Sequence, residues 1–498
     1  MLSENKKNFL NILGLYQKNH NLSILLSLFI FFVYGITWYL SDLIRFSPDS
    51  WTIFELSKSI FTDNFYEFTT IKSNFSEVKG VSFPFGFPIL LALIGEVIGY
   101  FPSNAIFINI LICILSSILI LNFTKEFKFP IKFQLLASLS LIFNPIYIDE
   151  VLSGRTIPLA ILLVLLAEYF LKLSPILYGL FLGLSALVRF DFLAISVLFI
   201  FGSYFYKKTF SKKIIIFKAF LGFFLGVSPW VVYSYINFEK LWISDHSWLV
   251  FSAVNKHFMD FPPQSDLTIF NSPLKWFLKV NLNILRQLRE FTNALLKNPI
   301  PLFLQLLVIK YFKILPKIDK KRLFISYFLL FISTSSYILT GVLAQRYFIF
   351  ILFSITLLSL WNISIISSYK DIFKEINKYI VLSLSLSLVL AFGKLSHTIL
   401  TSYLKNDNTQ IENKLISDLD TCHKYHPEKT YFFLREGEYY SKGVNPFKYG
   451  ALTSNKTATE PWNFDQMTLE EKNIYFKKIQ PYKIIPENLN FNSQSCRE

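Results

Sequence analysis

Charged residues are scarce in this chain. They make up 17% of its 498 residues, whereas hydrophobic residues make up 53%, and the mean hydropathy is +0.43. A soluble protein of this length would be left with far too much exposed apolar surface, so the composition excludes a soluble globular fold. It indicates a polytopic membrane protein.

Several motifs and residue types are also missing or rare. The chain has neither a G-x-x-x-x-G-K-[ST] loop nor the glycine fingerprint of dinucleotide-binding folds. Its histidines come without a convincing set of metal ligands, so we assign no metal and expect no cofactor. Of the three cysteines, Cys113 falls in an apolar segment, while Cys422 and Cys496 both lie in the tail. Two cysteines alone do not decide between a disulfide and free thiols there.

The positive charges that are present mark loops. The formal net charge is +15, but the lysines lie in short loops between apolar runs rather than on one continuous face. This distribution argues against nucleic acid as a partner and is typical of membrane topology signals.

About eleven apolar segments are predicted to cross the membrane as helices. The polar start of the chain shows no cleavable signal peptide, so we expect the first segment to stay as an anchor. The segments are 22–40, 103–122, 133–147, 157–171, 175–188, 190–206, 214–235, 299–315, 323–340, 347–366 and 380–400.

Residues 84–101 are apolar enough to span but are rich in glycine and proline. If this segment lies along or dips into the outer surface, all the lysine-rich loops fall on the cytoplasmic side, as the positive-inside rule requires. We therefore expect an interfacial or re-entrant segment. The lysine-rich loops are 125–132, 207–218, 310–322 and 370–378.

This topology divides the chain into three parts. Residues 1–21 form a cytoplasmic N-terminus, 22–400 a transmembrane domain, and 401–498 a soluble extracytoplasmic tail with a helix followed by short strands. The transmembrane domain has a first outer loop, 41–102, with interfacial helices, and a second outer loop, 236–298. The predicted fold is thus an all-α polytopic membrane protein with a small α/β C-terminal domain, located in the inner (plasma) membrane of a bacterial cell.

Two helices are expected on the outer surface. One is amphipathic and begins near Asp49, with Glu55 on its solvent side. The other, in 273–297, sets apolar residues among basic ones. One interpretation is a lid, in which Arg286 or Arg289 reaches a lipid phosphate. The other, which is preferred, is that the helix only attaches the chain to anionic lipid.

The order of several short motifs resembles the GT-C superfamily of integral membrane glycosyltransferases, in particular its bacterial protein mannosyltransferases and the aminoarabinose transferase of lipid A. The motifs are Asp49 in the first outer loop, "FPFGFPILLALIGEVIGYFPSNAIFINIL", "FNPIYIDEVLSGRTIPLAILLVLLAEYFL", "GLFLGLSALVRFDFLAISVLF" and "QRYFIFILF". The resemblance covers about residues 22–366. It departs from the family where Ser50 stands in place of a second acid.

The resemblance implies an enzyme that moves a sugar from a polyprenyl-phosphate donor to an extracytoplasmic acceptor, which is a lipid, a glycan or a protein, with inversion at the anomeric carbon. Asp49 is then the candidate base, because a carboxylate can take the proton of the attacking acceptor. Asp149 and Glu150, at the outer end of a span, are the candidates for a second functional acid. Neither replaces Asp49 in this interpretation.

The leaving group of such a transfer is a lipid phosphate, which arginine binds better than lysine does. The candidates are Arg155, Arg189 and Arg346, all predicted near outer ends of spans. Two other classes remain open: a transporter or flippase of lipid-linked sugars, and a polysaccharide polymerase or ligase. No internal repeat favours a transporter, although Glu168 and Lys394 lie within apolar segments.

Overall fold

The computed structural model describes most of the transmembrane region and short pieces of the tail. The described residues are 20–41, 46–63, 65–66, 70–71, 83–126, 129–171, 173–206, 212–242, 250–253, 268–340, 344–366, 370–404, 430–433, 457–459, 468–470 and 481–485. The predictions for residues 1–19, for the tail histidines and for Cys422 and Cys496 therefore lie outside the described residues.

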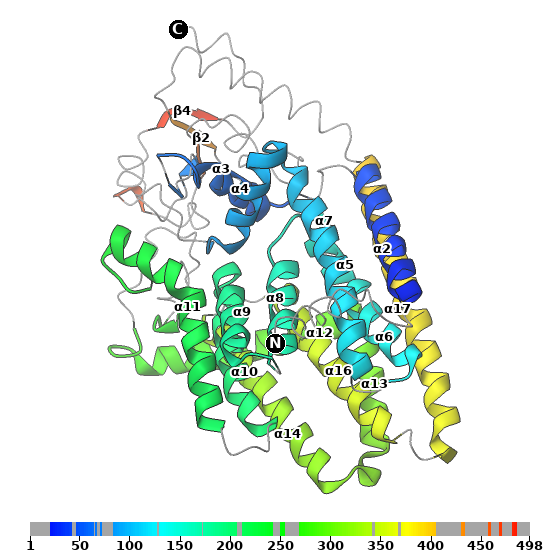
Figure 1. Ribbon diagram of the computed structural model, residues 1–498. Helices are drawn as coiled ribbons and strands as arrows, with labels where there is room; N and C mark the ends of the chain where they lie inside the picture. The colour runs from blue at the N-terminus through cyan, green and yellow to red at the C-terminus, as the bar shows by residue number, and fades with distance from the viewer. Residues whose placement is uncertain are drawn as a thin grey trace, which may run out of the picture.

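Helices account for nearly all of this structure (Figure 1). In the first half of the chain they are α2 (His20–Ser41), α3 (Pro48–Ser59), α4 (Gly86–Ile98), α5 (Ser103–Glu126), α6 (Ile131–Ile142), α7 (Pro145–Leu152), α8 (Ile157–Phe170), α9 (Pro175–Val188), α10 (Phe192–Tyr206) and α11 (Lys212–Phe238). In the second half they are α12 (Pro273–Lys297), α13 (Ile300–Lys310), η2 (Phe312–Ile314), α14 (Lys317–Ser333), α15 (Ser335–Thr340), η3 (Gln345–Phe348), α16 (Ile349–Ile366) and α17 (Lys370–Leu404).

Five helices in the described part of the chain are long and apolar enough to cross a membrane, or up to seven if each of two bent pairs counts as one span. The bent pairs are α6 with α7, at 54°, and α12 with α13, at 95°. The chain is therefore a helical membrane protein. The expected number of about eleven spans stays a prediction, because α8, α9, α10 and α14 are shorter than the length needed.

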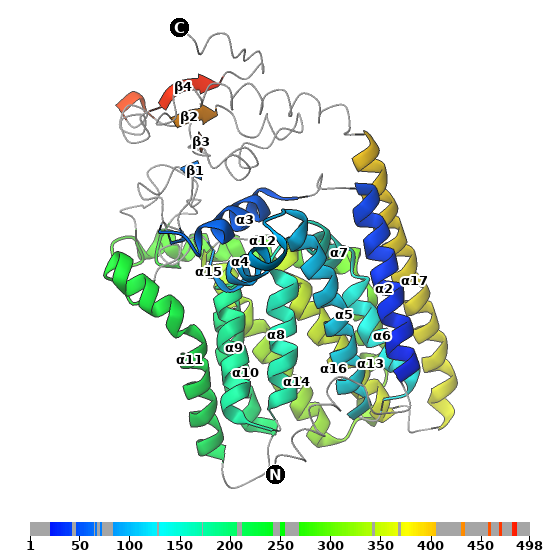
Figure 2. The same cartoon turned by 45° about the horizontal axis from the view of Figure 1, so that its top comes forward.

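The long helices form a bundle, and α2 and α17 lie side by side along one flank of it (Figure 1). At one end, α3 and α4 lie across the ends of the other helices (Figure 2). Helix α4 has 13 residues, which is about 20 Å at ~1.5 Å per residue and less than the ~30 Å hydrocarbon core. We call this end of the molecule the α3 end.

Helix α3 begins where the sequence predicts a helix near Asp49. The side chain of Ser47 caps it by accepting a hydrogen bond from Ser50 N, and Pro48 occupies the first turn, where its missing N–H costs nothing. The expected amphipathic pattern is wrong, however, because every residue from 50 to 57 is buried.

Glu55 was expected on the solvent side of this helix and is instead 5% exposed. The physical reason is that α4 packs on α3, so protein covers the face that was assigned to water. Burial lowers the pKa of the neighbouring Lys58, and the charge of Glu55 opposes that shift. The two side chains thus interact within the protein.

Helices α9 and α11 approach each other unusually closely. Gly179 and Gly183 on α9 face Gly222 and Gly226 on α11, and a Cβ atom at any of them would overlap backbone of the opposite helix. Small residues four apart on both helices are typical of tight packing in membranes, where dispersion rather than the hydrophobic effect drives association. This contact fixes α9, whose last residue is followed by Arg189.

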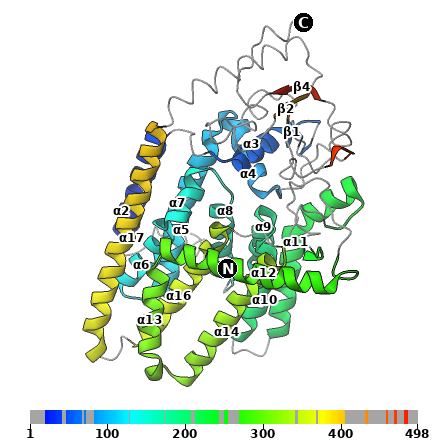
Figure 3. The same ribbon diagram turned by 180° about the vertical axis from the view of Figure 1, so that it is seen from behind.

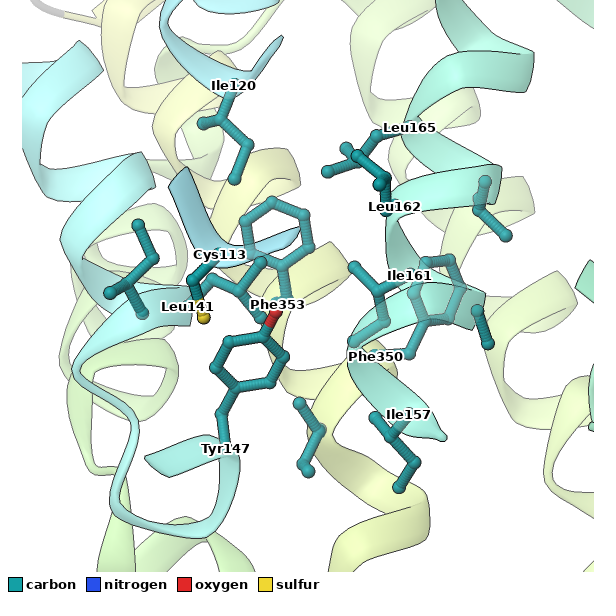
Figure 4. Close-up of a cluster of buried hydrophobic side chains, with 14 of the residues drawn as sticks. Cys113, Ile120, Leu141, Tyr147, Ile157, Ile161, Leu162, Leu165, Phe350 and Phe353 are labelled. Carbon is teal, nitrogen blue, oxygen red and sulfur yellow. The ribbon is translucent and has the colours of Figure 1, made fainter. Parts of the chain in front are cut away.

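The core lies between α5, α7, α8 and α16. Figure 4 shows Cys113 of α5 and Tyr147 of α7 facing Phe350 and Phe353 of α16, with the isoleucine and leucine side chains of α8 opposite them. Tyr147 is fully buried. It therefore anchors α7 two residues before Asp149.

Four short strands form a parallel sheet at the α3 end (Figure 2). They are β1 (Thr70–Ile71), β2 (Thr430–Phe433), β3 (Thr457–Thr459) and β4 (Pro481–Ile485), in the order β1-β3-β2-β4. Because β1 belongs to the predicted first outer loop and pairs with β3 of the tail, the two segments meet on one side of the bundle.

Replacing Gly179 with alanine should loosen the α9–α11 contact, since the added methyl group overlaps Ala219 O. Overpacking of this kind costs about 1–3 kcal/mol. We expect the Gly179→Ala protein to unfold at a lower temperature in detergent, as followed by fluorescence-detected gel filtration after heating. Gly393→Ala is the matched control, because nothing lies within 4 Å of its added Cβ, and an equal loss in both variants would contradict the close approach.

Candidate functional site

Acidic and basic side chains gather at the α3 end, although their residues are far apart in the sequence. Asp49 lies in the first turn of α3 and Glu150 on α7, and the arginines occupy positions just outside apolar helices. Arg155 precedes α8, Arg189 follows α9 and Arg346 is in η3. We call these five side chains the charged cluster.

Asp49 and Arg346 form the ion pair that joins the first loop to the late part of the chain. Arg346 Nη2 lies 3.3 Å from Asp49 Oδ2, and the two side chains are 26% and 37% exposed. The Arg346 guanidinium also interacts electrostatically with Glu150. It is therefore shared between two carboxylates and remains accessible to a ligand.

Glu150 is held by Arg155. Arg155 Nη1 donates to Glu150 Oε1 at 2.7 Å, and Glu150 is only 1% exposed. Arg155 Nε donates to Ser47 Oγ at 3.0 Å, which ties the arginine to the cap of α3. The backbone carbonyl of Arg155 accepts a hydrogen bond from Asn109 Nδ2, so Arg155 is fixed at both its ends.

Arg189 pairs with Asp191 through two hydrogen bonds, from Nε to Oδ1 at 2.9 Å and from Nη2 to Oδ2 at 3.2 Å. Such fork-to-fork geometry is among the strongest ion pairs of proteins. Arg189 Nη1 also donates to Thr156 Oγ1, and the Tyr337 hydroxyl donates to Asp191 Oδ2 at 2.8 Å. Both groups of this pair are thereby held in place from other elements.

Tyr347 connects the second and third arginines of the cluster. Its ring lies 5.4 Å from the Arg189 guanidinium and 5.5 Å from that of Arg346. It is also stacked on Tyr337, with ring centroids 4.8 Å apart. Cation–π contact of this kind holds two like charges close together without a carboxylate between them.

Asp149 does not join the cluster. Its carboxylate pairs with Lys394 Nζ of α17 at 2.9 Å, and the two side chains are 34% and 23% exposed. Consecutive helical residues point about 100° apart, so Asp149 and Glu150 face different neighbours. This ion pair also accounts for a lysine within an apolar segment, because a charge at that depth needs a partner.

Two polar atoms of the cluster remain available. Glu150 Oε2 and Arg346 Nε are buried and have no hydrogen-bond partner within the described parts of the chain. Buried polar atoms are nearly always satisfied, so orphaned ones in a cluster of charges indicate a place where a ligand donates and accepts hydrogen bonds. One is an acceptor and the other is a donor.

The sequence did not point to Asp191, Tyr337, Tyr347 or Ser47 as members of this region. Asp191 had a signal, because the acid of "RFDF" follows an arginine between two apolar helices, where a charge pair is expected. Tyr347 follows Arg346 in the motif "QRYFIFILF" but was not singled out, and Tyr337 carried no signal, since aromatic residues are common throughout the chain. Ser50 fills the place of a second acid and donates to Ser153 O instead.

No group of three or more metal-ligating side chains occurs among the residues that the structure describes. Two of the chain's histidines, His246 and His257 of the predicted second outer loop, lie outside those residues.

On α12, the two arginines that were weighed for a lid are exposed, while Lys279 is 5% exposed and donates to Ser252 O at 2.8 Å. Burial lowers the pKa of Lys279 to about 8. Arg289 pairs with Glu290 of the same helix, with Nη2 3.0 Å from Oε1. The preferred interpretation of this helix, attachment to anionic lipid, stays a prediction.

The fold and the site thus define a helical membrane protein with a cluster of arginines and carboxylates at one end of its bundle. No protein-family model matches the sequence, and no curated protein matches it significantly. The resemblance to GT-C glycosyltransferases accordingly remains an interpretation of the motifs.

Chemically, the cluster offers a carboxylate that water and a ligand can reach, and guanidinium groups that bind phosphate or carboxylate oxygens. Arg155 and Arg189 are held by strong partners, whereas the Arg346 contact with Asp49 is longer and more exposed. An anionic ligand would therefore displace Asp49 from Arg346 more easily than it would break the other pairs.

Removing one charge of the Asp149–Lys394 pair should destabilise the protein, because the other is left without its partner between helices. We expect Lys394→Met to lower the unfolding temperature in detergent by a few degrees, and the exchanged pair Asp149→Lys/Lys394→Asp to restore most of it. If Lys394→Met is destabilised and the exchanged pair is no more stable than Lys394→Met, the ion pair is not the cause of the loss.

Lys279 should make stability depend on pH. Its pKa in the folded protein is about 8, below the ordinary value of 10.5, so the unfolded chain binds more protons between these values. Folding should therefore become more favourable as the pH rises through this range. Chemical unfolding from pH 7 to 10 should show this rise relative to Lys279→Met, whereas no change in the difference between the two proteins would refute it.

Proposed function

We propose that this protein is a glycosyltransferase that moves a sugar from a polyprenyl-phosphate donor to an acceptor at the α3 end, with Asp49 as the base. The observation that carries the proposal is the Asp49–Arg346 ion pair, with Glu150, Arg155 and Arg189 around it. It sets a reachable carboxylate beside guanidinium groups at the end of a membrane bundle.

The topology of this proposal follows the predicted one. About eleven helices cross the inner membrane of a bacterium, with the N-terminus in the cytoplasm and the α3 end outside. The tail is a small α/β domain on that side. The pairing of β1 with β3 supports this, since it joins the tail to the first outer loop.

The proposed reaction forms a bond between the anomeric carbon and the acceptor atom and breaks the bond between that carbon and a phosphate oxygen. The acceptor hydroxyl or amine gives its proton to Asp49 as the new bond forms. The phosphate leaves with the electron pair of the broken bond. Attack from the face opposite the phosphate gives inversion.

Arginines stabilise the charge that grows on the departing phosphate. Arg346 is the group that the phosphate reaches first, because its contact with Asp49 is the weakest of the three. When Arg346 turns to the phosphate, Asp49 loses a positive neighbour, which raises its affinity for a proton. Binding of the donor thus prepares the base.

Glu150 has a different part in this scheme. Its Oε1 is occupied by Arg155, while Oε2 is buried and has no hydrogen-bond partner among the described residues. Oε2 is therefore placed to accept a hydrogen bond from a donor or acceptor hydroxyl and to orient it. Asp149, paired with Lys394, holds α7 in place.

The test is release of polyprenyl phosphate from a panel of polyprenyl-phosphate sugars by the protein in lipid, with cell-envelope extract as acceptor. Asp49→Asn should lower acceptor-dependent release by about 10²–10⁴-fold, since the amide cannot take a proton. Asp63→Asn is the matched control, because Asp63 is exposed just after α3, and it should retain full release.

Two outcomes would contradict the proposal. Equal loss in both variants would mean that Asp49 has no special part in the reaction. No release with any donor, together with movement of a lipid-linked sugar between leaflets, would replace the enzyme with a flippase.

A further inference from the structure

Helix α12 is inverted relative to an ordinary surface helix. Most of its large apolar side chains are exposed, and three of its polar ones are buried: Lys279, Asn283 and Gln287 are 5%, 0% and 6% exposed. The exposed apolar residues are Leu274, Phe277, Leu278, Leu282, Ile284, Leu285, Leu288 and Leu296. In a membrane protein this is the arrangement of a helix whose outer face meets lipid.

The helix lies across the bundle rather than along it. It makes an angle of 95° with α13, and Figure 3, which views the molecule from behind, shows it crossing in front of the long helices. Its buried side contacts the α3 end, where Asn283 Nδ2 donates to Ile338 O at 2.9 Å. A helix placed in this way lies in the plane of the membrane at the level of the headgroups of that leaflet.

Its exposed basic residues share one flank. Lys275, Arg286, Arg289 and Lys297 are all exposed, and at about 100° per residue they fall within an arc of roughly 80°. This arc includes the exposed Leu282 of the apolar face and borders the buried polar stripe at Lys279. The only acid of α12, Glu290, is half-buried and pairs with Arg289. The flank is therefore purely positive toward lipid headgroups.

We propose that this basic flank of α12 binds anionic phospholipid headgroups, and that Arg289 couples their binding to the charged cluster. The charge complementarity favours an anionic lipid over a zwitterionic one, since each basic residue near a membrane surface adds favourable interaction with anionic lipid. The inference stands without the glycosyl transfer proposed above.

The coupling runs through one carboxylate. Arg289 Nη2 lies 3.0 Å from Glu290 Oε1, and Glu290 Oε2 accepts a hydrogen bond from Gln345 Nε2 at 3.3 Å. Gln345 precedes Arg346, the partner of Asp49. The Arg289 side chain is 72% exposed, so a lipid phosphate can compete with Glu290 for its guanidinium. This competition changes the hydrogen bond that Glu290 accepts from Gln345 of η3.

Lipid binding can be measured without any sugar substrate. The full-length protein is reconstituted in phosphatidylcholine nanodiscs that contain increasing amounts of either brominated phosphatidylglycerol or brominated phosphatidylcholine. Quenching of the Trp276 fluorescence is obtained as the difference between the wild type and Trp276→Phe. Trp276 belongs to α12 and is half-buried. We expect brominated phosphatidylglycerol to quench at lower concentration.

The variant Lys275→Gln/Arg286→Gln/Arg289→Gln/Lys297→Gln should lose about tenfold of this preference. The charge-retaining Arg286→Lys/Arg289→Lys should keep it. If the fourfold variant fails to fold, Arg286→Gln/Lys297→Gln gives the same test with a smaller loss. Equal quenching by both lipids in the wild type, or a preference unchanged by the glutamine variants, would overturn the proposal.

The coupling has its own readout in hydrogen exchange of the η3 amides, compared between nanodiscs of phosphatidylcholine and nanodiscs that also hold phosphatidylglycerol. We expect the anionic lipid to change exchange at residues 345–348 in the wild type and in Lys275→Gln, but not in Arg289→Gln. Lys275 is the matched control because it shares the flank. A change that persists in Arg289→Gln, or none in the wild type, would refute the coupling.

Discussion

The charged cluster depends on mutual neutralisation. Burying a charge without a partner is costly at the edge of an apolar bundle, and here each arginine has a carboxylate: Arg346 has Asp49, Arg155 has Glu150 and Arg189 has Asp191. Only the Asp49–Arg346 pair joins distant regions of the chain, whereas the other two pairs are local. Hydrogen bonds from Arg155 to Ser47 and from Arg189 to Thr156 tie these local pairs to α3 and to the start of α8.

The pairs differ in strength, and that difference gives the site its chemistry. Arg189 is bound on both sides of its fork and Arg155 is locked between Glu150 and Ser47. Arg346 has the longest contact and a more exposed partner. A site built from equally strong pairs would resist any ligand, whereas this one has a single weak pair through which an anion can enter.

Much of this could be read from the sequence because composition and apolar runs report directly on burial in lipid. The helix near Asp49, the apolar segments of α2, α5, α11, α16 and α17, and the placing of charges at helix ends were predicted from such patterns. Burial of Glu55 was missed, because packing of α4 over α3 depends on contacts that no local pattern encodes. Asp149 and Glu150 were treated alike, since neighbouring acids look equivalent until the helix turns them toward different partners.

The central claim is that Arg346 exchanges Asp49 for a phosphate, and binding of polyprenyl phosphate to the protein in nanodiscs tests it most directly. Asp49→Asn removes the competing carboxylate, so the account predicts tighter binding than in the wild type, by about tenfold for one displaced ion pair. Arg346→Gln should weaken binding in the same assay. Binding that is unchanged or weaker in Asp49→Asn would contradict the account.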